Sequence, residues 1–186
     1  MKKLAISLAA SAAVFATPAL AQLNSSTESF EITADVPQVC AMEDINDVAL
    51  GTQAVSSSSG AGALELLGTD TGSTNQFYIS CNDATTLTLS SANQGLLNTS
   101  RGAPTGDDAE LFTNKLFYNL RLNNFVDGGN GAQPKLATKD TASSTFSGTE
   151  IHRQVSASVT ILPDQNPLRP LAGDYEDTAT VAITTI

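Results

Sequence analysis

The sequence predicts an all-β protein, an antiparallel β-sandwich. Apolar and polar residues alternate with period two in several segments of strand length, and clusters of Gly, Asn, Asp and Pro separate those segments. No segment combines a helical apolar period with capping residues at both ends. Strands of this kind bury one face each, and two such sheets packed face to face form a sandwich.

The first predicted strand, FEITADV, covers residues 30–36. Its four apolar side chains share one face of a strand, and the polar side chains between them occupy the other. The apolar positions are Phe30, Ile32, Ala34 and Val36. Pro37 ends or bends this strand, because proline has no N–H group to donate to a ladder.

The middle of the chain predicts a hairpin. NQFYISC (75–81) and TTLTLSS (85–91) both alternate, and Asn82-Asp83-Ala84 between them is typical of a tight turn. ALELL (63–67) is a short strand candidate. Gly, Asn and Pro punctuate residues 92–107, which predicts a long loop.

Three more strands are predicted in the second half. KLFYNLRLNNF (115–125) is the strongest central strand, RQVSASVTIL (153–162) alternates strongly, and residues 178–186 alternate at the end of the sequence. Residues 43–50 and 107–116 predict a turn or two of helix each.

The N-terminal residues 1–21 have the features of a secretory signal peptide. A basic start, an apolar run and the small-x-small sequence Ala19-Leu20-Ala21 predict cleavage before Gln22. The apolar run is too short for a membrane anchor. We therefore expect a single exported domain over residues 22–186, secreted or on the cell surface.

The charge balance argues against nucleic acid as a partner. The sequence has 9 basic and 19 acidic residues, a net charge of −10, and loss of Lys2 and Lys3 with the signal makes the domain more acidic still. Such a chain repels polyanions and anionic membrane surfaces.

Cys40 and Cys81 are the two cysteines of the sequence. In an oxidising compartment an isolated pair is most simply one structural disulfide. A metal or redox pair would need further ligands or a C-x-x-C spacing, and the sequence has neither.

The sequence predicts no enzyme. His152 is the single histidine, no serine lies in a G-x-S-x-G elbow, and the predicted disulfide uses both thiols. Residues 68–75 and 126–131 have the oxygen-rich, Gly-bent character of calcium loops, but neither fits the EF-hand spacing, and turn chemistry explains both. We expect no metal and no cofactor.

Several motifs, in the same order and spacing, resemble those of spore coat protein U domains and the related archaic chaperone–usher pilins. AGDYEDTATVAITTI resembles the C-terminal signature of that family, FEITADVPQVC its N-terminal strand, and FYISCNDATTLTLSS the surroundings of its second cysteine. KLFYNLRLNNF and HRQVSASVTILPDQNPLRPLAGDY resemble its central strand and its approach to the last strand.

The resemblance implies an incomplete immunoglobulin-like sandwich with a hydrophobic groove that a strand of a neighbouring subunit completes. On this reading residues 28–36 are the donor strand, with Phe30, Ile32, Ala34 and Val36 filling the groove, and Ala179, Val181 and Ile183 lie on the final strand at its border. It also implies three partners: neighbouring pilus subunits, a periplasmic chaperone and an outer-membrane usher. The function implied is a surface fibre (fimbrium) in adhesion or biofilm formation.

The alternative interpretation is a self-complete secreted sandwich that binds a surface or a carbohydrate. An alternating N-terminal strand begins many ordinary sandwiches, and it then pairs within its own sheet. The lead before Phe30 contains only Leu23 as an apolar residue, so one segment would have to serve both as donor and as the entry to the first strand.

Overall fold

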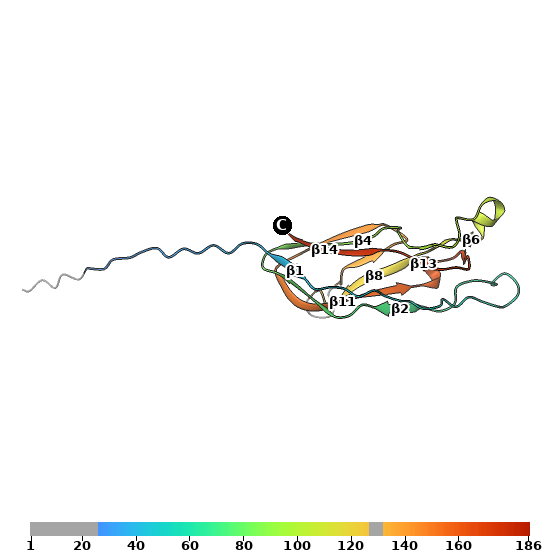
Figure 1. The fold of residues 1–186 in the computed structure, drawn as a ribbon, viewed down its shortest axis with the longest axis horizontal. Coiled ribbons are helices and arrows are strands. Elements are labelled where there is room, and N and C mark those ends of the chain that lie inside the picture. The colour runs from blue at the N-terminus through green and yellow to red at the C-terminus, as the bar shows by residue number, and fades with distance from the viewer. Residues whose placement is uncertain (1–25, 127–131) are drawn as a thin grey trace, which may run out of the picture. The chain divides into compact units, whose positions relative to one another are not determined.

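The computed structural model describes residues 26–126 and 132–186, so the predicted signal peptide lies outside the described residues. The chain divides into two units at Asp35 and Val36. The second unit is nearly all β, with antiparallel sheets, as the sequence predicts (Figure 1). Its strands and short 3-10 helices are β1 (Cys40–Met42), β2 (Asp70–Ser73), β3 (Phe77–Cys81), β4 (Thr85–Ser91), β5 (Leu96–Asn98), η1 (Gly106–Glu110), β6 (Phe112–Thr113), β7 (Lys115–Leu116), β8 (Tyr118–Asn123), β9 (Lys135–Ala137), β10 (Ser143–Gly148), β11 (Ile151–Ile161), η2 (Pro163–Gln165), β12 (Arg169–Pro170), β13 (Tyr175–Glu176) and β14 (Ala179–Thr185).

Two antiparallel sheets form the layers of the sandwich. One has the order β1-β3-β11-β8-β9, with β2 also pairing β11, and the other has the order β10-β4-β14. A short three-stranded sheet, β13-β5-β7, and the parallel pair β12-β6 extend the structure beyond these two sheets.

The core lies between the layers and follows the predicted alternation. β4 alternates buried and half-buried residues along its whole length, and β3 buries every second residue. The fully buried side chains at the centre include Phe77, Ile79, Leu87, Leu89 and Leu122. Because these side chains come from both sheets, the alternation of the separate strands produces one shared core.

The predicted central strand 115–125 is interrupted at Phe117. Asn166, which is buried, accepts a hydrogen bond from the Phe117 N–H at 2.7 Å and donates one to the Phe117 C=O at 2.9 Å. A side-chain amide thus replaces a strand partner at this residue, and the chain continues as β7 and β8 on either side.

Three local predictions are wrong. Residues 63–67 form a turn with one isolated bridge, between Val55 and Leu66, rather than a strand, and Leu64 has φ of 65°. Residues 43–50 contain no helix, and residues 70–73 are strand β2 rather than a turn. The turn or two of helix predicted within residues 107–116 is present as the short 3-10 helix η1, before β6 and β7.

Candidate functional site

The final strand β14 has one unpaired edge. It pairs antiparallel with β4, and no other ladder of the described residues includes it. Val181 lies opposite Leu89 and Ile183 opposite Leu87, so these four side chains share the inward face. The two leucines are fully buried, whereas Val181 and Ile183 are only partly buried against the core and Ala179 is exposed. The inward face of the sheet is therefore incompletely covered at β14.

Among the residues that the structure describes, a second unpaired edge belongs to residues 40–50 in the other sheet. β1 pairs antiparallel with β3, and the chain then continues along β3 and β2 without regular strand structure. Asn75 holds this continuation: its Oδ1 accepts from the Asn46 N–H at 2.9 Å, and its Nδ2 donates to the Asp44 C=O at 3.1 Å. Gly72 permits the close approach, because a Cβ there would lie 2.5 Å from Val48 Cγ1.

The inward face of this second edge is also incompletely covered. Met42 lies opposite Ile79 in the β1–β3 ladder, yet Ile79 is fully buried and Met42 is 38% exposed. Ile45 and Leu50 pack against the core and are only partly buried.

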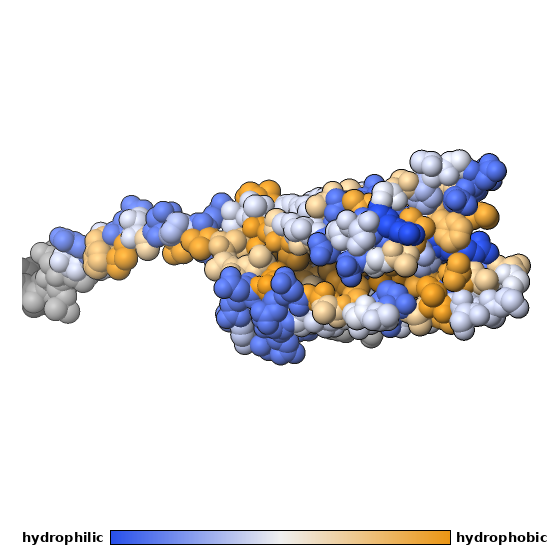
Figure 2. All heavy atoms as spheres, turned by 45° about the vertical axis from the view of Figure 1, so that its right-hand side comes forward, coloured by the Kyte–Doolittle hydropathy of each residue, from blue (hydrophilic) through white to orange (hydrophobic). Residues whose placement is uncertain are grey.

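We call the surface between these two edges the edge groove, formed by Met42, Ile45, Leu50, Val181 and Ile183. Figure 2 shows apolar residues gathered between the two layers, where the surface is hollowed. β1 and β14 have Cα atoms within 8 Å of each other. A strand paired to both needs them about 9.5 Å apart, so strand insertion must separate β1 and β14 by at least about 1.5 Å where they approach each other.

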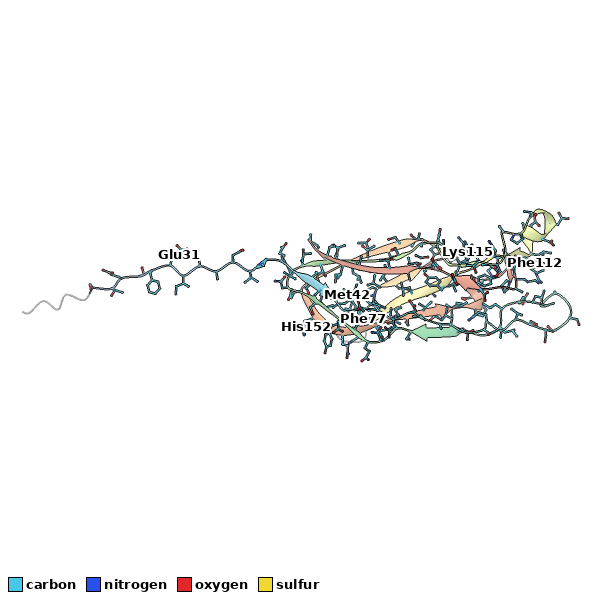
Figure 3. All side chains as sticks on the ribbon, in the orientation of Figure 1. Glu31, Met42, Phe77, Phe112, Lys115 and His152 are labelled. Atoms are coloured by element: carbon cyan, nitrogen blue, oxygen red, sulfur yellow. A yellow bond between two sulfur atoms is a disulfide. The ribbon has the colours of Figure 1, made fainter. Side chains whose placement is uncertain are left out.

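β1 begins and β14 ends at the same end of the sandwich. The disulfide joins Cys40 to Cys81, with a Cα–Cα distance of 4.2 Å, as the sequence predicts. The turn after Cys81 leads to Thr85, which lies opposite Thr185, and the Ile186 N–H donates to the Ala84 C=O at 3.0 Å. We call this end the proximal pole. Figure 3 shows His152 on the same side of the domain as Met42, with Phe112 and Lys115 toward the other end, the distal pole.

A partly buried hydrogen-bond network around Asp177 fixes the start of β14. The Asp177 carboxylate accepts hydrogen bonds from the Ser91 and Tyr118 hydroxyls, the latter at 2.7 Å, and from the backbone N–H groups of Asn93 and Thr178 at 2.9 and 2.8 Å. Burial raises the pKa of the Tyr118 hydroxyl well above its usual range, and the neighbouring Asp177 carboxylate raises it further. The network holds β14 in register with β4 at the distal end of the groove.

The predicted donor residues lie in an unstructured part of the chain. Residues 26–39 form no helix or strand, and the side chains of Phe30, Ile32 and Val36 are 84%, 83% and 76% exposed. Ala34 is exposed as well. A strand needs a partner for its backbone groups, so strand formation by residues 28–36 stays a prediction for an assembled state.

His152 lies on the outer face of the β3–β11 sheet. Its Nδ1 and the Ser80 hydroxyl are 2.8 Å apart, and its ring stacks on Tyr78 with centroids 5.5 Å apart. Serine and histidine are a possible nucleophile–base pair, but in the described part of the chain no carboxylate is bonded to the histidine to orient it. Nor do the described residues contain a group of three or more metal-ligating side chains.

Within the same described ranges, no helix has the length and apolar character needed to cross a membrane. A scan against protein-family models finds no match for this chain, and neither does a search of curated proteins for similar sequences.

Sequence reasoning found one border of the groove and missed the other. Ala179, Val181 and Ile183 belong to β14, as expected, but residues 43–50 were expected to be helical. No local signal identifies residues 40–50 as an edge, because the bonds that hold them come from residues about thirty positions away.

Proposed function

We propose that this protein is the structural subunit of a secreted surface fibre of the chaperone–usher type, in which residues 28–36 of one subunit complete the edge groove of the next. One observation carries the proposal. Two unpaired strand edges face each other across apolar side chains that the domain itself covers only in part. Such edges invite pairing with another strand.

The N-terminal segment has the chemistry that this groove needs. Phe30–Val36 equals β14 in length, and its apolar side chains alternate with Glu31, Thr33 and Asp35. As a strand beside β14 it directs the apolar side chains toward Val181, Ile183 and the core, and the two carboxylates toward water. Its backbone N–H and C=O groups hydrogen-bond with those at the unpaired edge of β14.

The position of the poles favours insertion antiparallel to β14. Residues 37–39 lead into β1 at the proximal pole, where β14 ends. Antiparallel insertion puts the donor's Val36 beside the start of β14, at the distal pole of the acceptor. Parallel insertion would put it at the proximal pole, where the acceptor's own N-terminal segment departs. Antiparallel insertion therefore joins distal pole to proximal pole, a heterologous contact that propagates into an open fibre.

The proposed partners follow from this assembly. An exposed apolar groove aggregates before it is filled, so a periplasmic chaperone protects it and an outer-membrane usher exchanges the chaperone for the next subunit. The disulfide agrees with an oxidising compartment outside the cytoplasm. A fibre of this kind on the cell surface serves adhesion or biofilm formation.

A gel of the purified mature protein tests the proposal. Donor-strand polymers resist SDS, so the unboiled sample is expected to run as a ladder and the boiled sample as one band. A synthetic peptide of residues 26–36, present during refolding, is expected to occupy the groove and shorten the ladder. A peptide with Ile32 replaced by Asp is the matched control. A protein that stays monomeric and ignores the peptide is instead the self-complete binding module.

A further inference from the structure

Three residues connect the proposed donor segment to β1, and the turn after β3 holds them. The Val39 N–H donates to Asn82 Oδ1 at 2.8 Å, and Asn82 Nδ2 donates to the Pro37 C=O at 2.9 Å. The Asn82 N–H donates to the Val39 C=O at 3.2 Å, and the Gln38 side-chain amide donates to the Asp83 carboxylate. The β1–β3 ladder thus continues past the disulfide, with Asn82 serving as the partner of both Val39 and Pro37.

These residues are also where the chain would have to turn if a subunit filled its own groove. The edge groove lies along the free edge of β1, and only residues 37–39 separate residues 28–36 from β1. To lie in that groove they would have to form a hairpin with β1, with its turn at Pro37, Gln38 and Val39. The bonds to Asn82 and Asp83 hold the same three residues as an extension of β1.

The chemistry of the connection also disfavours a hairpin. Three-residue hairpin loops end in a left-handed residue, usually glycine, and the residue in that place here is Val39, whose branched side chain disfavours positive φ.

We infer that Asn82, with Asp83, is a positioning residue that keeps a subunit from filling its own groove and so reserves residues 28–36 for a second copy of this chain. The inference rests on the proposed function. The exposed turn after β3 thus helps to determine whether a subunit closes on itself or joins a fibre. We call the two side-chain bonds of Asn82 to Val39 and Pro37 the clamp. Because these bonds reach only the connection, their loss is expected to change whether a subunit closes on itself without unfolding the domain.

Two variants test the inference. Asn82→Ala removes the two bonds that the Asn82 side chain makes to the connection and leaves the bond between Gln38 and Asp83. The second variant adds Gln38→Asn and Val39→Gly, which supply a hairpin turn. Gln133→Ala is the matched control. The Gln133 amide likewise accepts from a backbone N–H, of Phe125, and donates to a backbone C=O, of Val126, but it lies beside β9, at the opposite edge of the sheet from β1.

Two readouts follow the subunit. A Glu-specific protease cuts after Glu31 only while residues 28–36 lie outside a groove. In the monomer fraction no neighbouring groove is present, so the rate of this cleavage reports whether a subunit fills its own groove. The triple variant is expected to slow this cleavage at least tenfold and to lose the SDS-resistant ladder. Asn82→Ala is expected to show part of both effects, and Gln133→Ala to behave as the wild type. Circular dichroism verifies that each variant is folded.

The inference is overturned if the triple variant and Asn82→Ala are cleaved at Glu31, and form ladders, as the wild type does. Failure of the proposed function has a different appearance: the wild type itself forms no ladder. The cleavage assay still tests the role of Asn82 in that case. Slower cleavage of the triple variant than of the wild type supports the inference, and equal cleavage refutes it.

Discussion

Placing a single charge at position 32 distinguishes a fibre subunit from a self-complete domain. Ile32 is 83% exposed in the subunit, so Ile32→Asp is expected to change the free energy of unfolding of the monomer by no more than about 0.5 kcal/mol. In the proposed joint the same side chain enters the edge groove. Burying an isoleucine there is worth roughly 1.5–3 kcal/mol.

The aspartate loses this gain and adds the cost of an unpaired buried carboxylate, about 2 kcal/mol or more even when the group becomes neutral. The sum is on the order of 4–5 kcal/mol for each joint. Since each 1.4 kcal/mol is a tenfold change in affinity, about a thousandfold weaker joint is expected.

Thr33→Asp is the control for this prediction. It places the same charge one residue away, on the face that points to water in the proposed strand, and about a tenfold change at most is expected. The assay exports each variant with a chaperone and compares soluble chaperone–subunit complex with SDS-resistant ladder. The reasoning predicts normal complex for both variants and a ladder only for Thr33→Asp. Equal ladders from the two variants would refute the proposed alternation, and a destabilised Ile32→Asp monomer would show that residues 28–36 fill their own domain.

Four further predictions follow from the contacts within the domain. Replacing Cys40 and Cys81 by serine is expected to lower the free energy of unfolding by about 4 kcal/mol, measured by urea titration, because the disulfide closes a loop with a sequence separation of 41; mass spectrometry of the unreduced wild type is expected to find no free thiol. Asp177→Ala is expected to cost about 2–3 kcal/mol in the same titration, because it leaves buried donors without an acceptor. Burial raises the pKa of the Tyr118 hydroxyl, so its contribution to stability is present below about pH 10 and is lost as the pH rises further; in titrations at several pH values the alkaline decline is expected to be shallower in Tyr118→Phe. His152→Ala is expected to leave assembly unchanged and unfolding within about 0.5 kcal/mol, since the side chain is exposed on an outer face; loss of assembly with the fold intact would contradict this.

Local pattern predicted the strands that carry the core. β4 has the predicted bounds, because strict alternation and a turn sequence both lie within a few residues of it. β10 was missed because SSTFSG contains a single large apolar residue, Phe146, and an outer strand needs little more. β5 lies in the predicted long loop, and its place depends on β7 and β13 rather than on its own residues.

The candidate site was harder to predict for the same reason. The β14 border alternates and is visible in the sequence, but the border at residues 40–50 depends on Asn75 and Gly72, far along the chain. The clamp of Asn82 on Pro37 and Val39 depends likewise on the register of Cys40 with Cys81. Such long-range amide bonds leave no periodic signal.

Hydrogen exchange of the assembled wild-type protein tests the central claim most directly. In the monomer, residues 30–36 have exposed side chains and belong to no strand, and one edge of β14 has no ladder partner among the described residues. If residues 28–36 complete a neighbour's groove, amides of residues 30–36 and of the free edge of β14 exchange slowly in the polymer, by a factor of about a hundred or more, and rapidly in the monomer. Rapid exchange of residues 30–36 in an SDS-resistant polymer, or slow exchange already in the monomer, would contradict the account.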